Sequence, residues 1–168
     1  MLAQAALLIF PILMAYAACS DLLTMRIANW LVITVAVSYV ALAVILQLSW
    51  TEIGMAAAAA AIVLAISFAF FAFGWVGGGD AKLVSASALW VGFGLMLQYL
   101  IYAALLGGAL TLLLLWLRRL PLPAALARHK WIDRLHDRKT GVPYGIALAL
   151  AALLVYPQTS IFARVAGI

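Results

Sequence analysis

Two aspartates stand where long apolar runs of this sequence end. Asp80 closes the run Gly77-Gly78-Gly79-Asp80 between two apolar stretches, and Asp21 ends the first apolar stretch. An ionisable carboxylate at the edge of a membrane span is costly, so each is a candidate functional residue. If the two carboxylates meet, they cannot both ionise cheaply, and the pair holds one proton between them. The ionised member can take a proton from a water that attacks a peptide carbonyl, while the protonated member polarises that carbonyl.

The three glycines before Asp80 favour a substrate site but also fit a structural role. Without Cβ atoms they permit a positive φ and a sharp turn, and they leave room for an extended substrate backbone. In the alternative interpretation, Gly77–Gly79 caps the C-terminus of one helix and Asp80 is the N-cap of the next. That alternative accounts for Asp80 but not for Asp21.

The composition is that of a membrane protein. Of 168 residues, 69% are hydrophobic and 9% charged, with a mean hydropathy of +1.21, far outside the range of soluble domains. Long apolar stretches predict transmembrane helices. Five such regions are 1–19, 30–48, 54–76, 83–117 and 142–157.

The region 83–117 is too long for one span. Its 35 residues would extend about 52 Å as a single helix. We expect it to fold back between Gly92-Phe93-Gly94 and Gln98-Tyr99, into a short span near 82–93 and a longer one near 97–117. The sequence therefore predicts an all-α polytopic membrane protein with six transmembrane helices. It would form a single domain over residues 1–168, with one cytoplasmic amphipathic loop at about 118–141.

The distribution of basic residues supports six spans and orients them. With both termini outside, the cytoplasmic segments are 20–29, 77–82 and 118–141, and they hold nine of the ten Lys and Arg residues, leaving Arg164 outside. The positive-inside rule requires this distribution, and it brings the two aspartates to one face. Topology and contact with anionic headgroups also explain the net charge of +5, so the basic residues need no nucleic-acid partner.

Four minor features predict structural roles rather than chemistry. The single cysteine, Cys19, excludes an intramolecular disulfide and a multi-cysteine zinc site, and we expect a small buried thiol there. Gly107-Gly108 is expected to be a helix-packing stripe. Ser87 could face the Asp80 cleft from i+7, but a hydroxyl bonded to its own helix backbone is the commoner case. Ala15-Tyr16-Ala17 looks like a signal cleavage site, yet no basic segment precedes this apolar run, so we expect it to stay as a span.

The basic loop carries an amphipathic pattern. From Ala124 the alternation of apolar and charged residues predicts a short helix lying on the headgroups. His129, Asp133 and His136 would share one face of that helix, which leaves a metal site as a weaker alternative. We expect no metal and no cofactor.

Three segments resemble one family. Gly78-Gly79-Asp80 followed by Ala81-Lys82-Leu83 resembles the GxGD signature of intramembrane aspartic peptidases, and Gly-Gly-Gly-Asp-x-Lys is typical of prepilin peptidases. The segment from Asp21 to Asn29 is similar to their first-aspartate segment, with Ala28 where a proline is usual. Val142-Pro143-Tyr144-Gly145 resembles the motif that opens their last helix.

The resemblance implies an aspartic endopeptidase of the short, peptidase-only type associated with tight-adherence (Flp, type IVb) pili. Such an enzyme cleaves the leader of a prepilin at the cytoplasmic face of the bacterial inner membrane, ahead of the pilin's hydrophobic helix. Catalysis would fall to Asp21 and Asp80. Residues expected to support them or to lie near substrate are Gly77, Gly78, Gly79, Lys82, Arg26, Asn29, Pro143, Tyr144 and Gly145. The expected partners are the prepilin, membrane lipids and other pilus-assembly proteins.

The larger, bifunctional prepilin peptidases carry paired cysteines in an added cytoplasmic region, associated with N-methylation of the new amino terminus. This sequence has no cysteine pair, so we expect cleavage without N-methyltransferase activity. Two other classes stay open. One is an ion- or proton-coupled carrier, which also uses acids in the membrane, although no acid lies mid-span here to carry a proton through. The other is an inactive pilus-assembly factor, which Ala28 would permit.

Overall fold

The computed structural model describes residues 2–167, and all of their side chains except those of residues 2–5 and 124. Within this range the chain is helical, with no strand. Its elements are α1 (Leu2–Thr24), α2 (Asn29–Ile45), α3 (Trp50–Ala72), α4 (Gly78–Leu117), α5 (Ala124–Ala127), α6 (Lys130–His136), α7 (Tyr144–Val155), the 3-10 helix η1 (Tyr156–Gln158) and α8 (Ser160–Ala166).

The long apolar helices confirm an all-α membrane protein. By length and composition, α1, α3 and α4 can each span a membrane, and the bent pair made by α7–η1 and α8 is a fourth candidate. Helix α2 is apolar but has only 17 residues. The described chain therefore has three to four candidate spans, and the six-span topology stays a prediction.

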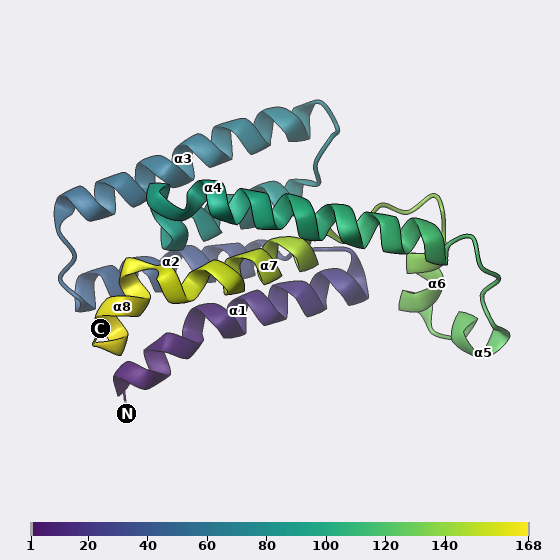
Figure 1. Cartoon of the computed structure of the whole chain (residues 1–168), viewed down its shortest axis with the longest axis horizontal. Coiled ribbons are helices and arrows are strands. Elements are labelled where there is room, and N and C mark those ends of the chain that lie inside the picture. The colour runs from purple at the N-terminus through teal and green to yellow at the C-terminus, as the bar shows by residue number, and fades with distance from the viewer. Residues whose placement is uncertain (1, 168) are drawn as a thin grey trace.

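Helix α4 reverses direction within its length. Gly92 has φ 66° and ψ 177°, non-helical values that divide α4 into a short and a long half, and glycine tolerates a positive φ because it has no Cβ. Figure 1 shows the two halves running in opposite directions. Asp80 in the short half and Gly107 in the long half line the same pocket, although a straight helix would hold them about 40 Å apart. The reversal predicted for this region is confirmed.

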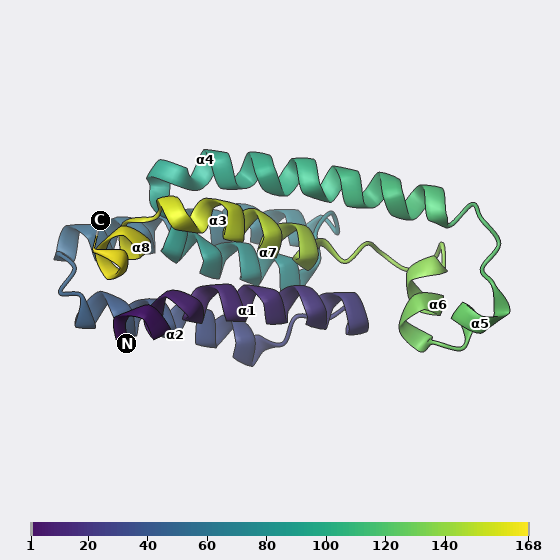
Figure 2. The same cartoon turned by 60° about the horizontal axis from the view of Figure 1, so that its bottom comes forward.

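The polar connections gather at one end of the helical bundle. The α1–α2 connection, the α3–α4 connection and the loop with α5 and α6 lie at the same end, and both termini lie at the opposite end (Figures 1 and 2). The segments 20–29, 77–82 and 118–141, predicted to share one face of the membrane, therefore share one end of the molecule.

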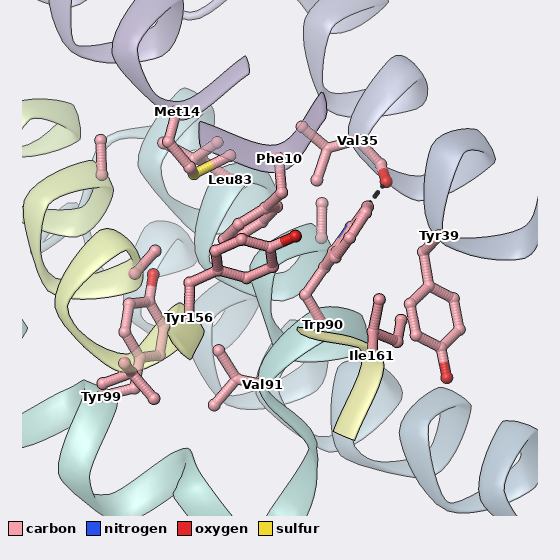
Figure 3. Packing of buried hydrophobic residues seen from close by; sticks show 14 of the residues in the cluster. Phe10, Met14, Val35, Tyr39, Leu83, Trp90, Val91, Tyr99, Tyr156 and Ile161 are labelled. Carbon is pink, nitrogen blue, oxygen red and sulfur yellow. Dashed lines mark hydrogen bonds between the residues drawn. The ribbon is translucent and has the colours of Figure 1, made fainter. Parts of the chain in front are cut away.

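An aromatic cluster joins the helices of the bundle away from the polar end. Trp90 of α4 donates its indole N–H to the carbonyl of Val35 in α2 at 3.0 Å, as Figure 3 shows. Phe10 of α1 stacks on Trp90, with ring centroids 4.7 Å apart, and also contacts Tyr156. Tyr156 in turn donates its hydroxyl to the carbonyl of Leu7 at 3.1 Å. One cluster thus fixes α1, α2, the short half of α4 and η1 against each other.

Side-chain capping and an ion pair order the end that carries the termini. Ser49 and Glu52 form a capping box at the start of α3: Ser49 Oγ accepts from the Glu52 N–H, and Glu52 accepts from the Ser49 N–H, which satisfies two donors at the helix end. Arg164 of α8 forms an ion pair with Glu52. The one basic residue predicted to lie outside is thereby joined to the start of α3.

The basic loop differs from its prediction. Two short helices, α5 and α6, replace a single helix from Ala124, because His129 adopts an extended conformation (ψ 108°) as the N-cap of α6. His129 is then out of helical register with Asp133 and His136. Within the described residues no cluster of His, Cys, Asp and Glu could hold a metal ion, so the alternative metal site is not supported. Cys19 was expected to be buried, but it is exposed on α1.

Candidate active site

Asp21 is buried in the last turn of α1, where it meets the start of α7. Its side chain is 5% exposed, and its Oδ2 accepts the backbone N–H of Gly145 at 2.8 Å. Gly145 lies in the first turn of α7, whose N–H groups have no partner within the helix. The Asp21 carboxylate therefore satisfies a free donor from a segment 124 residues away. A negative charge is also favoured near a helix N-terminus.

This contact requires glycine at position 145. A Cβ there would lie 2.8 Å from Asp21 Oδ2, 2.8 Å from Ile27 Cδ1 and 3.1 Å from Asp21 Cβ. Real Cβ atoms do not approach other atoms so closely in packed interiors, and an added methyl group would force these neighbours apart. Pro143, in the motif expected to open the last helix, is the buried N-cap of α7. In the sequence, Gly145 was a candidate only because of the family resemblance. In the structure, its lack of a side chain allows the close contact with Asp21.

Asp80 is the third residue of α4, and it is half-buried. The helix N-cap is Gly77, with no side-chain capping bond, so the alternative interpretation of Asp80 as an N-cap is wrong. A Cβ on Gly77 would lie 2.8 Å from Asp80 Oδ2, which shows that the carboxylate folds back over this glycine. Among the described residues, the Asp80 side chain forms no hydrogen bond that caps a helix.

The three glycines act through close approach rather than through a positive φ. Gly77 has φ −67°, and the turn from α3 toward α4 uses Gly74, at φ 75°. A Cβ on Gly78 would lie 3.1 Å from the Phe71 ring, and one on Gly79 would lie 3.2 Å from Ile27 Cβ. The prediction that these glycines provide a sharp turn is therefore wrong. Their lack of side chains lets α4 approach α3 and the α1–α2 connection.

Asp21 and Asp80 line one cavity of about 500 Å³. Its walls come from the end of α1, the α1–α2 connection and the start of α4. Ile27 joins these parts, because it packs against both Gly79 and Gly145. The predicted site residues on this cavity are Asp21, Arg26, Asn29, Gly77, Gly78, Gly79 and Asp80. The structure thus brings together the two segments that the sequence singled out.

Two basic residues near the cavity were predicted to support the aspartates. Lys82 Nζ donates to Asn29 Oδ1 at 2.9 Å, and this bond joins α4 to α2 beside the cavity. No salt bridge in the described chain joins Lys82 or Arg26 to an aspartate. The Arg26 carbonyl accepts hydrogen bonds from the hydroxyls of Ser20 and Thr24, which holds the α1–α2 connection in place.

Asp80 also borders a second, mostly apolar pocket of about 470 Å³. This pocket, here called the apolar groove, lies between α3, the long half of α4 and α7. Its lining residues are Val63, Ile66, Ser67, Phe70, Trp75, Val76, Asp80, Val84, Leu100, Ala103, Ala104, Gly107, Gly108, Tyr144, Ala147 and Leu148. Asp80 lines both spaces, so the polar cavity and the apolar groove meet at this carboxylate.

Tyr144 belongs to the groove rather than to the polar cavity. Its hydroxyl shares a hydrogen bond of 3.0 Å with Thr111 Oγ1, and a Cβ on Gly107 would lie 3.2 Å from its ring. Gly107 therefore lets the tyrosine ring lie on α4, whereas a Cβ on Gly108 would have no atom within 4 Å. Ser87 is fully buried and donates to Met14 Sδ at 3.7 Å, and it lies on neither space.

Ile27, Ser67 and Thr111 were missed by sequence reasoning. Each is an ordinary residue for its helix or connection, and only the contact it makes across the bundle distinguishes it. A buried Ser67 Oγ that donates to the Ala81 carbonyl at 3.2 Å, for example, joins α3 to α4. A serine within an apolar stretch of sequence does not indicate which backbone carbonyl its hydroxyl will bond.

The sequence model of the type IV leader peptidase family matches residues 8–112. The match includes Asp21, Asp80 and the connections that carry them, and it ends before α7. Neither the curated proteins nor the solved structures contain a match to this chain. A family match over this much of the chain, on a helical membrane framework with both aspartates on one cavity, leads to one assignment: this protein belongs to the type IV leader peptidase family, whose members act on prepilin substrates.

Proposed function

We propose that this peptidase is an aspartic endopeptidase with Asp21 and Asp80 as its catalytic pair. The observation that carries the proposal is that the two carboxylates, 59 residues apart in sequence, line one cavity. Asp21 accepts a hydrogen bond from the Gly145 N–H, and Asp80 lines the cavity without capping a helix. Both arrangements fit carboxylates that act on a bound substrate.

The chemistry follows from two carboxylates that share one proton. The oxygen of a bound water attacks the scissile carbonyl carbon and gives a proton to the ionised aspartate, while the protonated aspartate gives its proton to the carbonyl oxygen. Collapse of this tetrahedral diol breaks the C–N bond as a proton passes to the leaving nitrogen. The two aspartates exchange protonation states during the reaction, so we assign the roles to the pair and not to either residue.

The apolar groove supports a place for the substrate's own helix. A prepilin presents a polar leader followed directly by a hydrophobic helix, and the site presents a polar cavity joined to an apolar groove at Asp80. We propose that the hydrophobic helix lies in the groove while the bond to be cut, which follows a glycine of the leader, lies in the cavity. Burial of apolar side chains would then position the scissile bond at the aspartates.

We further propose six membrane spans, with the site at the cytoplasmic face of the bacterial inner membrane. The spans would be α1, α2, α3, the two halves of α4, and α7. Support comes from the distribution of Lys and Arg and from the grouping of the polar segments at one end of the bundle (Figure 1). Both termini would lie outside.

The substrate class that we propose is a Flp-like (type IVb) prepilin, cleaved without N-methylation. The α1–α2 connection comprises only residues 25–28, so no additional region is inserted there. The single cysteine of the sequence, Cys19, lies exposed on α1. The short connection and the single cysteine support cleavage without N-methylation.

Replacement of each aspartate tests the proposal. Co-expression with a candidate Flp prepilin should give a mobility shift on a gel. Asp21→Asn and Asp80→Asn should each abolish it, and the double variant should be no worse, because the pair acts as a unit. Asp133→Asn, at an exposed acid of the loop, is the control and should cleave normally. Near wild-type cleavage by either active-site variant would refute an aspartic mechanism at that residue and favour a carrier or an inactive assembly factor.

A further inference from the structure

Arg118 is a buried cation without a buried anion. It is the C-cap of α4 and only 7% exposed. Its Nε donates to the Leu135 carbonyl at 2.7 Å, and its Nη2 donates to Thr140 Oγ1 and to the Gly141 carbonyl at 3.2 and 2.9 Å. All of these acceptors are neutral. Buried charges are ordinarily paired, yet the salt bridge found among the described residues joins Arg164 to Glu52, at the opposite end of the bundle.

Two more arginines converge on the same place. Arg138 donates from Nε and Nη2 to the Arg118 carbonyl, at 3.4 and 3.2 Å. A cavity of about 250 Å³ is lined by Leu115, Arg118, Arg119 and Arg138, and we call it the arginine cavity. Its walls carry three positive charges and no carboxylate. The C-terminal dipole of α4 offsets only about half of one charge.

The nearby acids do not neutralise this charge. Asp133 and Asp137 lie in the same loop, but neither lines the arginine cavity, and neither forms a salt bridge within the described chain. The Asp137 carboxylate accepts the backbone N–H of Lys139 at 2.8 Å instead. The arginine cavity therefore lacks an anion of its own.

Position and shape indicate which anion fits. Arg118 ends a long apolar helix, so the cavity lies where α4 leaves the apolar part of the bundle. Leu115, half-exposed one turn earlier, adds an apolar wall. The N–H groups of a guanidinium form charge-assisted hydrogen bonds with the oxygens of a phosphate group. On Arg118, Nη1 forms no hydrogen bond with a described residue, while Nε and Nη2 are occupied. Basic pockets at this depth suit phospholipid headgroups.

We infer that the arginine cavity binds an anionic phosphate group, supplied by the headgroup of an anionic phospholipid whose acyl chain lies along Leu115. Arg118 provides the buried base of the site, and Arg119 and Arg138 provide its exposed rim. The ligand would also stabilise the segment between Gly141 and Gly145, which contacts Asp21. Arg118 holds the Gly141 carbonyl, and four residues later the Gly145 N–H holds Asp21.

Lipid binding by the purified full chain tests the inference without any measurement of cleavage. The protein in a neutral detergent is titrated with phosphatidylglycerol, with phosphatidylcholine and with inorganic phosphate, and bound lipid is counted by native mass spectrometry. The variants are Arg119→Gln and Arg138→Gln, which leave the buried Arg118 in place. Arg128→Gln is the matched control, because Arg128 is an exposed arginine of the same loop outside the cavity.

We expect one phosphatidylglycerol to bind in preference to phosphatidylcholine. Each rim variant should weaken its affinity about fivefold, the factor for one cation beside an anionic headgroup, and Arg128→Gln should not. Competition by inorganic phosphate would confirm recognition of the phosphate group. Binding of inorganic phosphate with no preference among the lipids would assign the cavity to the free anion. Equal binding of the two lipids without phosphate binding, or an equal loss in Arg128→Gln, would overturn the inference.

Discussion

Gly145→Ala tests whether the main chain of α7 holds Asp21 in place. The added Cβ would lie 2.8 Å from Asp21 Oδ2 and 2.8 Å from Ile27 Cδ1. Overpacking of this kind costs about 1–3 kcal/mol of folding free energy. Relief by displacement of Asp21 would lengthen the 2.8 Å hydrogen bond from the Gly145 N–H. Displacement of a catalytic carboxylate by about 1 Å from its reactive position can lower the rate of catalysis on the order of 100-fold.

The assay combines the rate of cleavage of a prepilin peptide with thermal unfolding of the purified protein in detergent. Gly145→Ala should lower kcat/KM on the order of 100-fold and the free energy of unfolding by about 1–3 kcal/mol. Gly54→Ala is the control. No atom lies within 4 Å of a Cβ at that helical position, so alanine should leave activity unchanged and stabilise the protein by about 0.5–1 kcal/mol.

A second substitution separates the two clashes. Ile27→Val removes Cδ1 and leaves the clash with Asp21. In the double variant with Gly145→Ala, part of the lost stability should return while activity stays low. If Gly145→Ala retains both activity and stability, then the contact between α7 and Asp21 does not position the carboxylate, and our account of the site is wrong. If Ile27→Val restores full activity, the clash with Ile27 alone is responsible.

Two further predictions concern the α1–α2 connection and the topology. Ala28 has φ −70° and ψ 141°, and proline adopts this φ without strain. Ala28→Pro should therefore preserve cleavage and raise the free energy of unfolding by about 0.4–1 kcal/mol. A destabilised variant in the thermal assay would show that this connection needs another conformation. A reporter fused at Arg128 should indicate the cytoplasm and one at Trp50 the periplasm, because the basic residues orient the spans, and a periplasmic signal at Arg128 would contradict the six-span proposal.

Some features of this protein follow from local chemistry and could therefore be predicted from the sequence. Long apolar stretches led to the all-α membrane class because a bilayer tolerates backbone only in fully hydrogen-bonded form. The reversal in α4 was predicted from the length of one stretch and from the glycines at positions 92 and 94, and Gly92 does carry the positive φ. Asp21 and Asp80 were conspicuous because charged residues are rare in apolar surroundings.

The contacts that build the site could not be predicted in this way. In a soluble helix, the polar face shows which side is buried, but here the faces toward lipid and toward the core are both apolar, so periodicity does not reveal the rotation of each helix. The roles of the glycines are an example. The sequence indicated a turn at Gly77–Gly79. In the structure, the absence of Cβ atoms at these glycines leaves room for the side chains of Phe71, Ile27 and Asp80 to pack against them.

The sequence by itself thus determined which charged residues are functional candidates, because a charge beside an apolar span costs free energy, and that these residues lie where the spans end. Only the tertiary structure decided what surrounds them. It placed the Gly145 N–H on Asp21, made Asp80 the shared wall of a polar cavity and an apolar groove, and buried Arg118 among neutral acceptors. Each of these contacts joins segments far apart in sequence, and each depends on the distance and rotation between packed helices, which no local pattern of residues encodes.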